Sequence, residues 1–66
     1  MIGDRIKAAR EAAGMTQSDL ARAAGVNRQS VSAWESGAYS PGLYSLVVLS
    51  RVLEMPLEKL MKEEEK

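Results

Sequence analysis

The sequence predicts an all-α fold of five short helices in a chain of 66 residues. Apolar residues recur three and four positions apart in these segments, which is the spacing of one helix face. Thr16 and Asn27 are strong N-cap residues, and each precedes such a segment. Pro41 and Pro56 stand where two more helices begin, since proline fits the first helical turn. These three features favour a small helical domain.

The first predicted helix runs from about Ile2 to Ala13, and Gly14 ends it. Its apolar stripe consists of Ile2, Ile6, Ala9 and Ala13. At about 100° per residue, Arg10 falls at the edge of that stripe instead of facing solvent. This helix therefore presents both an apolar face and a cation to its neighbours.

Residues 16–37 predict two short helices joined by a sharp turn. Thr16 and Asp19 have the spacing of a capping box at the start of the first helix. Gly25 supplies the turn, because glycine reaches positive φ without steric cost. Asn27 caps the second helix, which turns Val31 and Trp34 toward the core. This is a helix-turn-helix arrangement, which offers its second helix to a DNA groove.

Two further helices are expected downstream. Ser40 is expected to cap a helix that starts at Pro41 and runs to about Glu54. Its expected core stripe is Leu43, Leu46, Val47, Ser50 and Leu53. Pro56 opens a last short helix in which Leu57 and Leu60 face inward, and Met61 suits either the core or an interface. We expect one domain over residues 1–62 and a polar tail over residues 63–66.

The chain resembles the Cro/repressor-like helix-turn-helix proteins of phages and bacteria, the XRE family. The matching residues are Ile6, Arg10, segments 15–17, 20–21, 25–32 and 34–37, and then Pro41, Leu43, Leu46, Leu49, Leu53 and 57–60. The likeness covers about residues 2–61. It implies a repressor-like DNA-binding domain of five helices, in a transcriptional regulator that usually acts as a dimer.

Two opposite charges, Arg10 and Glu35, stand at the margins of helices that must pack together. We therefore predict a partly buried ion pair with a structural role. The resemblance supports this, because an Arg–Glu pair at these positions is common in the family.

The outward face of the third predicted helix is polar, and it carries no Lys or Glu before Glu35. In the major groove, Arg pairs with guanine, Gln pairs with adenine, and an Ala methyl meets the thymine methyl. The predicted base-contacting residues are Asn27, Arg28, Gln29, Ser32 and Ala33, with Asn27 also expected to serve as the cap. The resemblance assigns a phosphate contact to Gln17, and Ser36 with the amides near Gly37 is a second candidate.

Alanine stands at positions 33 and 38, where basic residues are frequent in the family. The loss of these charges predicts weaker and less salt-dependent binding to DNA.

A line of apolar residues beside the core stripe predicts the dimer interface: Tyr44, Val48, Val52 and Met55, followed by Pro56 at the turn. Such a line on an exposed helix face is typical of a contact between copies. The expected species is a two-fold homodimer on a near-palindromic operator, with recognition helices about 34 Å apart.

Composition limits the other functions. The chain has no Cys and no His, which argues against an enzyme, a thiolate metal site or a disulfide, and we expect no cofactor. The formal net charge is zero, with five basic residues against three acidic ones between Asp4 and Arg28. We expect a cytoplasmic, nucleoid-associated prokaryotic or phage protein with no membrane contact and no small-molecule effector. The alternative is an antitoxin-like or other protein-interaction module that retains this fold.

Overall fold

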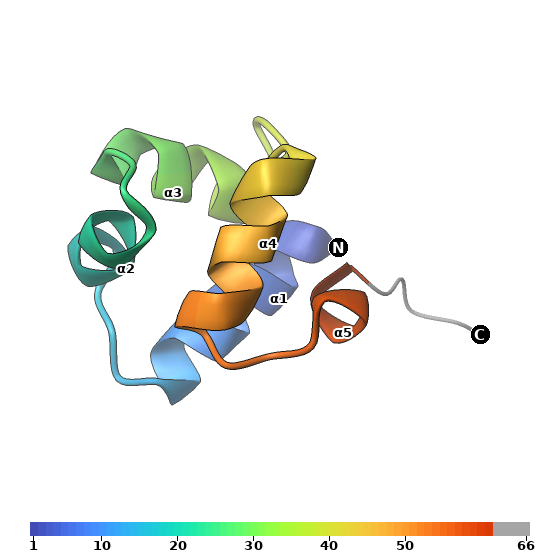
Figure 1. Cartoon of the computed structure of the whole chain (residues 1–66). Helices are drawn as coiled ribbons and strands as arrows, with labels where there is room; N and C mark the ends of the chain where they lie inside the picture. The colour runs from blue at the N-terminus through green and yellow to red at the C-terminus, as the bar shows by residue number, and fades with distance from the viewer. Residues whose placement is uncertain (62–66) are drawn as a thin grey trace.

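A computed structural model describes residues 1–61, which form five helices and no strand (Figure 1). The helices are α1 (Ile2–Ala12), α2 (Gln17–Ala24), α3 (Arg28–Ser36), α4 (Leu43–Val52) and α5 (Leu57–Met61). The predicted all-α, five-helix fold is confirmed. The tail expected at residues 63–66 lies outside the described residues.

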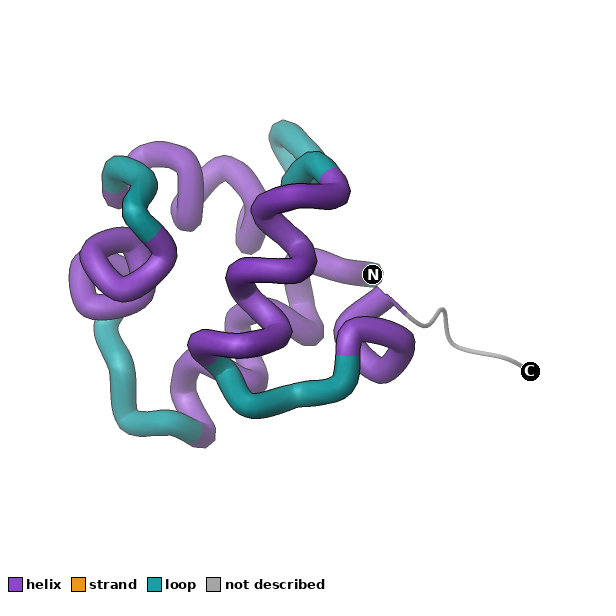
Figure 2. The backbone as a smooth tube through the Cα atoms, viewed as in Figure 1, coloured by secondary structure: helices purple, strands orange, loops and turns teal. Residues whose placement is uncertain are grey.

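The helices enclose one core. In Figure 1, α4 crosses the front of the molecule with α1 behind it, and α2 and α5 lie at opposite sides. Helix α3 packs against α1 and α2, while α4 packs against α2 and α5. The connecting segments all run around the outside of this bundle (Figure 2). The pair α2–α3 is therefore supported by α1, which packs against α3, and by α4, which packs against α2.

Each helix contributes one large, fully buried side chain to the core: Ile6, Leu20, Val31, Leu49 and Leu60. Complete burial of such a side chain contributes about 1.5–3 kcal/mol relative to its exposure to water. Trp34 is only 8% exposed and joins the same cluster, as its position in the sequence predicts. The core therefore fixes the rotation of every helix about its axis.

Helix α1 ends one residue earlier than expected, at Ala12. Ala13 forms the C-cap and is exposed, so its predicted place in the apolar stripe is wrong. The chain leaves the helix through Gly14, whose φ is +72°. The stripe stops at Ala9 because the last turn of α1 extends past the core.

The start of α4 also differs from the prediction. Gly42 is the N-cap and no side chain caps it, so the expected cap at Ser40 and first helical position at Pro41 are wrong. Pro41 is buried, which holds the chain ahead of the helix against the core. Leu46 and Leu49 then face inward, and Leu43 is 68% exposed instead of buried. Tertiary packing has moved the start of the helix by two residues.

The end of α4 and the start of α5 also differ from the prediction. Helix α4 ends at Val52, with Leu53 as C-cap, before the expected end near Glu54. The carbonyl of Pro56 accepts hydrogen bonds from the amides of Lys59 and Leu60, at 3.0 and 3.1 Å, so Pro56 precedes α5 rather than opening it.

Candidate nucleic-acid interface

A capping box fixes the start of α2. The hydroxyl of Thr16 accepts a hydrogen bond from the amide of Asp19 at 3.0 Å, and the Asp19 carboxylate accepts one from the Thr16 amide at 2.9 Å. The backbone amide and then the hydroxyl of Thr16 hold the pKa of Asp19 below its usual value. Both groups that the sequence pairs at this terminus are therefore satisfied.

The turn between α2 and α3 depends on Gly25, which has a φ of +75°. This is the left-handed region that other residues enter only at a steric cost. The amide of Val26 then donates to the carbonyl of Ala21 at 2.9 Å and closes the turn. The helix-turn-helix geometry is thus set by local bonds before any packing is considered.

Asn27 caps α3. Its side-chain oxygen accepts hydrogen bonds from the amide of Ser30 at 2.9 Å and from the Ser30 hydroxyl at 3.0 Å. Of the two roles predicted for Asn27, the structure shows the cap, because the side-chain carbonyl oxygen is engaged by the helix. The amide nitrogen of Asn27 is the group left for a base or phosphate.

The remaining predicted DNA-contacting residues share one side of α3. Arg28, Gln29, Ser36 and Gly37 are exposed, while Ser32 and Ala33 are half-buried. Val31 and Trp34 occupy the opposite, buried side. The structure therefore presents a polar surface along α3 with a single charged side chain, Arg28, at its beginning.

Arg10 and Glu35 form a bidentate ion pair between α1 and α3. Nε of Arg10 lies 2.6 Å from one Glu35 oxygen, and a terminal guanidinium nitrogen lies 3.1 Å from the other. The side chains are only 9% and 5% exposed. Another guanidinium nitrogen donates to the carbonyl of Met15 at 2.8 Å, so Arg10 also anchors the chain between α1 and α2.

The charges in this pair are stabilised in place. Burial alone would raise the pKa of the Glu35 carboxyl. The hydrogen bonds from Arg10 and Gln17, with the positive charges of Arg10 and Lys7, outweigh burial and hold that pKa below its usual value. The hydrogen bond to Glu35 raises the pKa of Arg10.

Sequence reasoning missed the position of Gln17 in this network. Its side-chain nitrogen donates to Glu35 at 3.0 Å, and its side-chain oxygen accepts from Arg28 at 3.4 Å. Gln17 thus connects the buried pair to the exposed end of α3. Local sequence patterns cannot predict this hydrogen bond, because Gln17 and Glu35 are 18 residues apart.

Gly3 is a second position whose importance the sequence alone does not indicate. It is buried in α1, where the helix backbone passes close to the end of α3. A Cβ at this position would meet the carbonyl oxygens of Trp34 and Glu35, the latter at 2.9 Å. The absence of a side chain is what lets α1 approach the helix that carries the polar surface.

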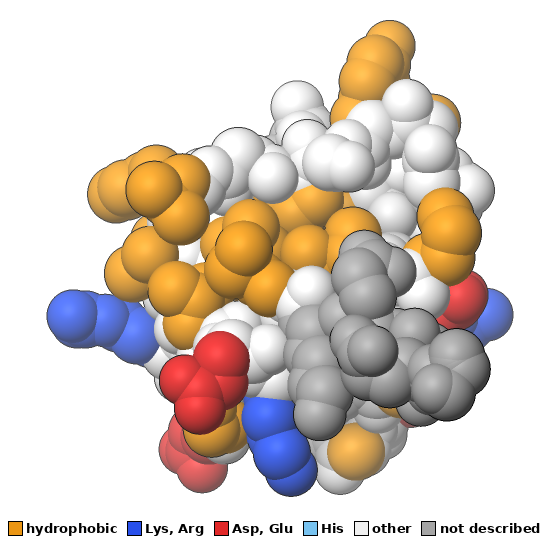
Figure 3. Space-filling model, turned by 90° about the vertical axis from the view of Figure 1, so that its right-hand side faces the viewer, with side chains coloured by type: hydrophobic (Ala, Val, Ile, Leu, Met, Phe, Trp, Pro, Cys, Tyr) orange, Lys and Arg blue, Asp and Glu red, His pale blue; other side chains and the backbone are white. Residues whose placement is uncertain are grey.

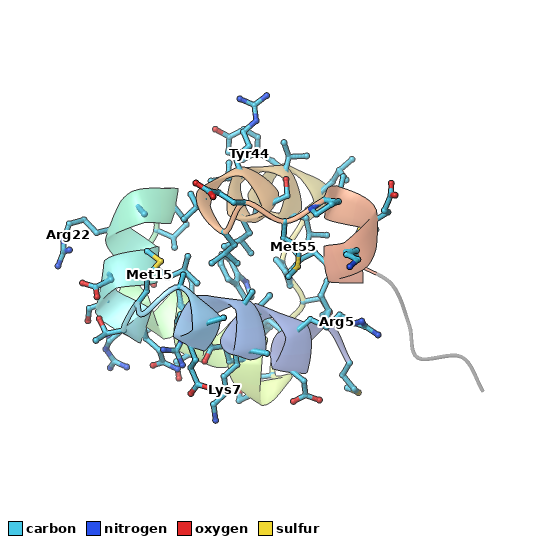
Figure 4. All side chains as sticks on the ribbon, turned by 90° about the horizontal axis from the view of Figure 1, so that it is seen from below. Arg5, Lys7, Met15, Arg22, Tyr44 and Met55 are labelled. Atoms are coloured by element: carbon cyan, nitrogen blue, oxygen red, sulfur yellow. The ribbon has the colours of Figure 1, made fainter. Side chains whose placement is uncertain are left out.

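The apolar line predicted for the dimer interface is divided by the fold. Tyr44 is 82% exposed and, with half-buried Val48, lines a groove beside Val26 at the α2–α3 turn. Met55 instead packs against the core and lines a cleft between α1 and α5. Figure 4 shows Met55 turned toward α1, and Tyr44 on the far side of α4. The expectation of one continuous line through Met55 is therefore wrong.

The other two residues of that line differ from each other. Val52 is half-buried and packs against the core, whereas Pro56 is exposed. Leu43, which the sequence places in the core, is exposed next to Tyr44. Apolar side chains gather over a broad area of the face that Figure 3 shows.

Two further observations concern the described part of the chain. No helix within residues 1–61 has the length and apolar character needed to cross a membrane. The acidic side chains of the same residues form no cluster arranged to hold a metal ion.

Comparison with known proteins agrees with this geometry. A family model described as Helix-turn-helix matches residues 6–60. The uncharacterized HTH-type transcriptional regulator y4dL of Sinorhizobium fredii is 38% identical over 56 residues, which are 85% of this chain and 29% of that protein. The chain spans between 29% and 55% of the lengths of the curated relatives it matches.

Solved structures give the same result. The P22 c2 repressor in complex with a synthetic operator is similar with a TM-score of 0.90 at 30% identity, over 97% of both chains. The biofilm regulator SinR of Bacillus subtilis in complex with DNA has a TM-score of 0.89 at 35% identity, over 94% of this chain and all of that one. The chain belongs to the helix-turn-helix family, and within it to the repressor-like XRE type.

Proposed function

We propose that this domain binds double-stranded DNA sequence-selectively and acts as a transcriptional regulator, most simply a repressor, on a near-palindromic operator. The observation that carries the proposal is the polar surface of α3. The buried side of α3 fixes the rotation of this helix, so that its polar surface faces outward. Caps fix the starts of both α2 and α3. The similar P22 c2 repressor and SinR have been solved with DNA, which supports this use of the fold.

The proposed docking places α3 in the major groove. Arg28 and Gln29 are exposed in the first turn of α3, where a recognition helix commonly meets base edges. Ser32 and Ala33 follow on the same helix and supply a hydroxyl and a methyl group. Gln17 at the start of α2 and Ser36 at the end of α3 are proposed to contact phosphates. The Gly37 amide already donates to the carbonyl of Trp34 at 3.3 Å, so the contact expected from this amide is not part of the proposal.

The working species is proposed to be a homodimer joined through α4. Leu43 and Tyr44 are 68% and 82% exposed, and half-buried Val47 and Val48 continue the apolar surface along the helix. A contiguous exposed apolar surface on a small domain is typical of an interface. One domain also reads few base pairs, so two half-sites about 34 Å apart increase affinity and selectivity together.

The test of DNA binding is selection from a random duplex pool, followed by gel shift with the selected and a shuffled duplex. The proposal expects a near-palindromic selected sequence and clear preference over the shuffled one. Equal shifts of the two duplexes would contradict it.

The dimer is tested by sedimentation of Tyr44→Asp beside Ala23→Asp, which places the same charge on an exposed position of α2. Only Tyr44→Asp is expected to give a folded monomer with weaker operator binding. If the unmodified protein is a monomer at tens of micromolar and still binds the operator tightly, the interface is wrong.

The exposed apolar surface of α4 also supports the alternative, a module whose main partner is another protein. It differs from the first proposal in one measurable respect: such a module has no need of the α3 surface. Loss of selectivity in Arg28→Ala would favour DNA, and an absence of any selective shift by the unmodified protein would favour the protein partner.

A further inference from the structure

We infer that a pocket between α1, α2 and α3 binds a backbone phosphate of DNA, and that Lys7 on α1 supplies its cation. This inference rests on the proposed DNA binding and specifies one contact within it. Lys7 belongs to none of the motifs identified in the sequence, and its side chain is exposed in the structure.

The pocket has a volume of about 300 Å³, and its walls combine residues from three helices: Lys7, Arg10, Gln17, Ser32, Glu35 and Ser36. Three of these, Gln17, Ser32 and Ser36, belong to the set proposed to face DNA on other grounds. The pocket therefore opens on the surface that the duplex would cover, and Lys7 stands on its rim.

Of the two cations in this pocket, Lys7 is the one available to an anion. The guanidinium of Arg10 already donates hydrogen bonds to both oxygens of Glu35 and to the Met15 carbonyl. Lys7 is exposed and forms no ion pair among the residues that the structure describes. Its charge nevertheless reaches the pocket, since it contributes to lowering the pKa of Glu35.

Polar groups around Lys7 suit a phosphate oxygen. The exposed hydroxyl of Ser36 donates to the carbonyl of Ala33 at 3.2 Å and can rotate to donate to an anion instead. Half-buried Ser32 adds a second hydroxyl. Helix α2 begins at Gln17 beside the pocket, so the positive end of its dipole favours an anion there. A cation, two hydroxyls and a helix start thus converge on one space.

Lys7 also compensates for a shortage of positive charge on the recognition surface. Alanine at positions 33 and 38 leaves Arg28 as the one cation between residues 27 and 38. Lys7 restores a positive charge to this side from another helix. In Figure 4 its side chain projects from α1 away from Tyr44, so the phosphate pocket and the proposed dimer surface lie on different sides of the molecule.

The test compares Lys7→Gln with Lys59→Gln, which removes the same charge from an exposed position on α5 beside a different cleft. Operator affinity is measured by fluorescence anisotropy as a function of salt concentration, with the selected duplex and with a random one. Loss of one phosphate contact reduces the slope of log affinity against log salt by about 0.9, and hence by about 1.8 in a dimer. Thermal unfolding verifies that both variants fold.

Lys7→Gln should show this smaller slope and weaken both duplexes by the same factor, while Lys7→Arg and Lys59→Gln keep the original slope. A duplex carrying a methylphosphonate at the contacted position of each half-site should erase the difference between Lys7→Gln and the unmodified protein. An unchanged slope in Lys7→Gln, with selective binding by the unmodified protein intact, overturns this inference alone. If the unmodified protein binds no duplex selectively, the proposed function falls and takes the inference with it.

Discussion

The side-chain amide of Gln17 donates a 3.0 Å hydrogen bond to Glu35, and this contact ties the start of α2 to the last turn of α3. The other end of the same amide accepts from Arg28. Gln17 is thus engaged at both ends in the free protein. It holds α2 against α3 in addition to any contact that it makes with phosphate.

Replacement of Gln17 by Ala should therefore reduce both stability and DNA binding. Loss of a hydrogen bond to a partly buried charged group costs about 1–3 kcal/mol of unfolding free energy. Binding should weaken for selected and random duplexes alike, because no base contact is removed. Urea unfolding and anisotropy measure the two effects. Ser18→Ala, at an exposed neighbour in α2, is the control; equal stability of the two variants would count against the link.

Removal of one partner of the Arg10–Glu35 pair should be strongly destabilising. Arg10→Met leaves a buried carboxylate without its guanidinium, at a cost of about 3–5 kcal/mol. Domains of this kind have total stabilities of about 5–15 kcal/mol, so the variant is expected to be partly unfolded at moderate temperature. Denaturant titration gives the value.

The double variant Arg10→Glu with Glu35→Arg separates charge pairing from packing. It should recover part of the lost stability if the pair itself matters. A fully stable Arg10→Met protein with impaired DNA binding would show instead that Arg10 acts on DNA.

Stability should fall in acid because of Glu35. Its pKa is lower in the folded protein than the ordinary value of 4.5, so the unfolded chain binds the proton more readily. The stabilisation is complete above that ordinary value and is lost as the pH falls through the lowered, folded value. Asp19 acts in the same direction around its own ordinary value of 3.8.

Urea midpoints from neutral to acidic pH measure this dependence. Glu35→Gln should be less stable at neutral pH and should show a smaller decline in acid than the unmodified protein. A decline of the same size in both would assign the acid sensitivity to other carboxylates.

Gly3→Ala should destabilise the contact between α1 and α3. The new Cβ meets backbone carbonyl oxygens, which cannot rotate away, so the helices must separate. Forced shifts of this kind cost about 1–3 kcal/mol. Gly42→Ala is the matched control, because a Cβ there meets nothing within 4 Å and φ is an ordinary −72°. Equal melting temperatures of the two variants would contradict the proposed close approach.

The parts of the fold that the sequence predicts are those set by local bonds. The caps at Thr16 and Asn27 and the turn at Gly25 depend on residues within five positions of each other, and the structure contains all of them. The start of α4 could not be read this way. Ser40 and Pro41 form a good local signal for a helix start, but burial of Pro41 places the start after it.

The site shows the same division. The outward residues of α3 follow from helical phase, because Val31 and Trp34 identify the buried side. Helical phase also indicates the Arg10–Glu35 pair between α1 and α3. It gives no indication of the contacts of Gln17 with Glu35 and of Gly3 with the end of α3. Helical spacing does not place Met55 correctly, because α4 ends at Val52, before that residue.

The most direct test of the account is base-by-base discrimination by the first turn of α3. Affinities of the unmodified protein, Arg28→Ala and Gln29→Ala are measured for the selected operator and for all its single base-pair substitutions. Each variant should lose about 1–3 kcal/mol of discrimination at one position of the half-site and keep its preferences elsewhere. If Arg28→Ala retains both the affinity and the full preference of the unmodified protein, α3 does not read the major groove as proposed.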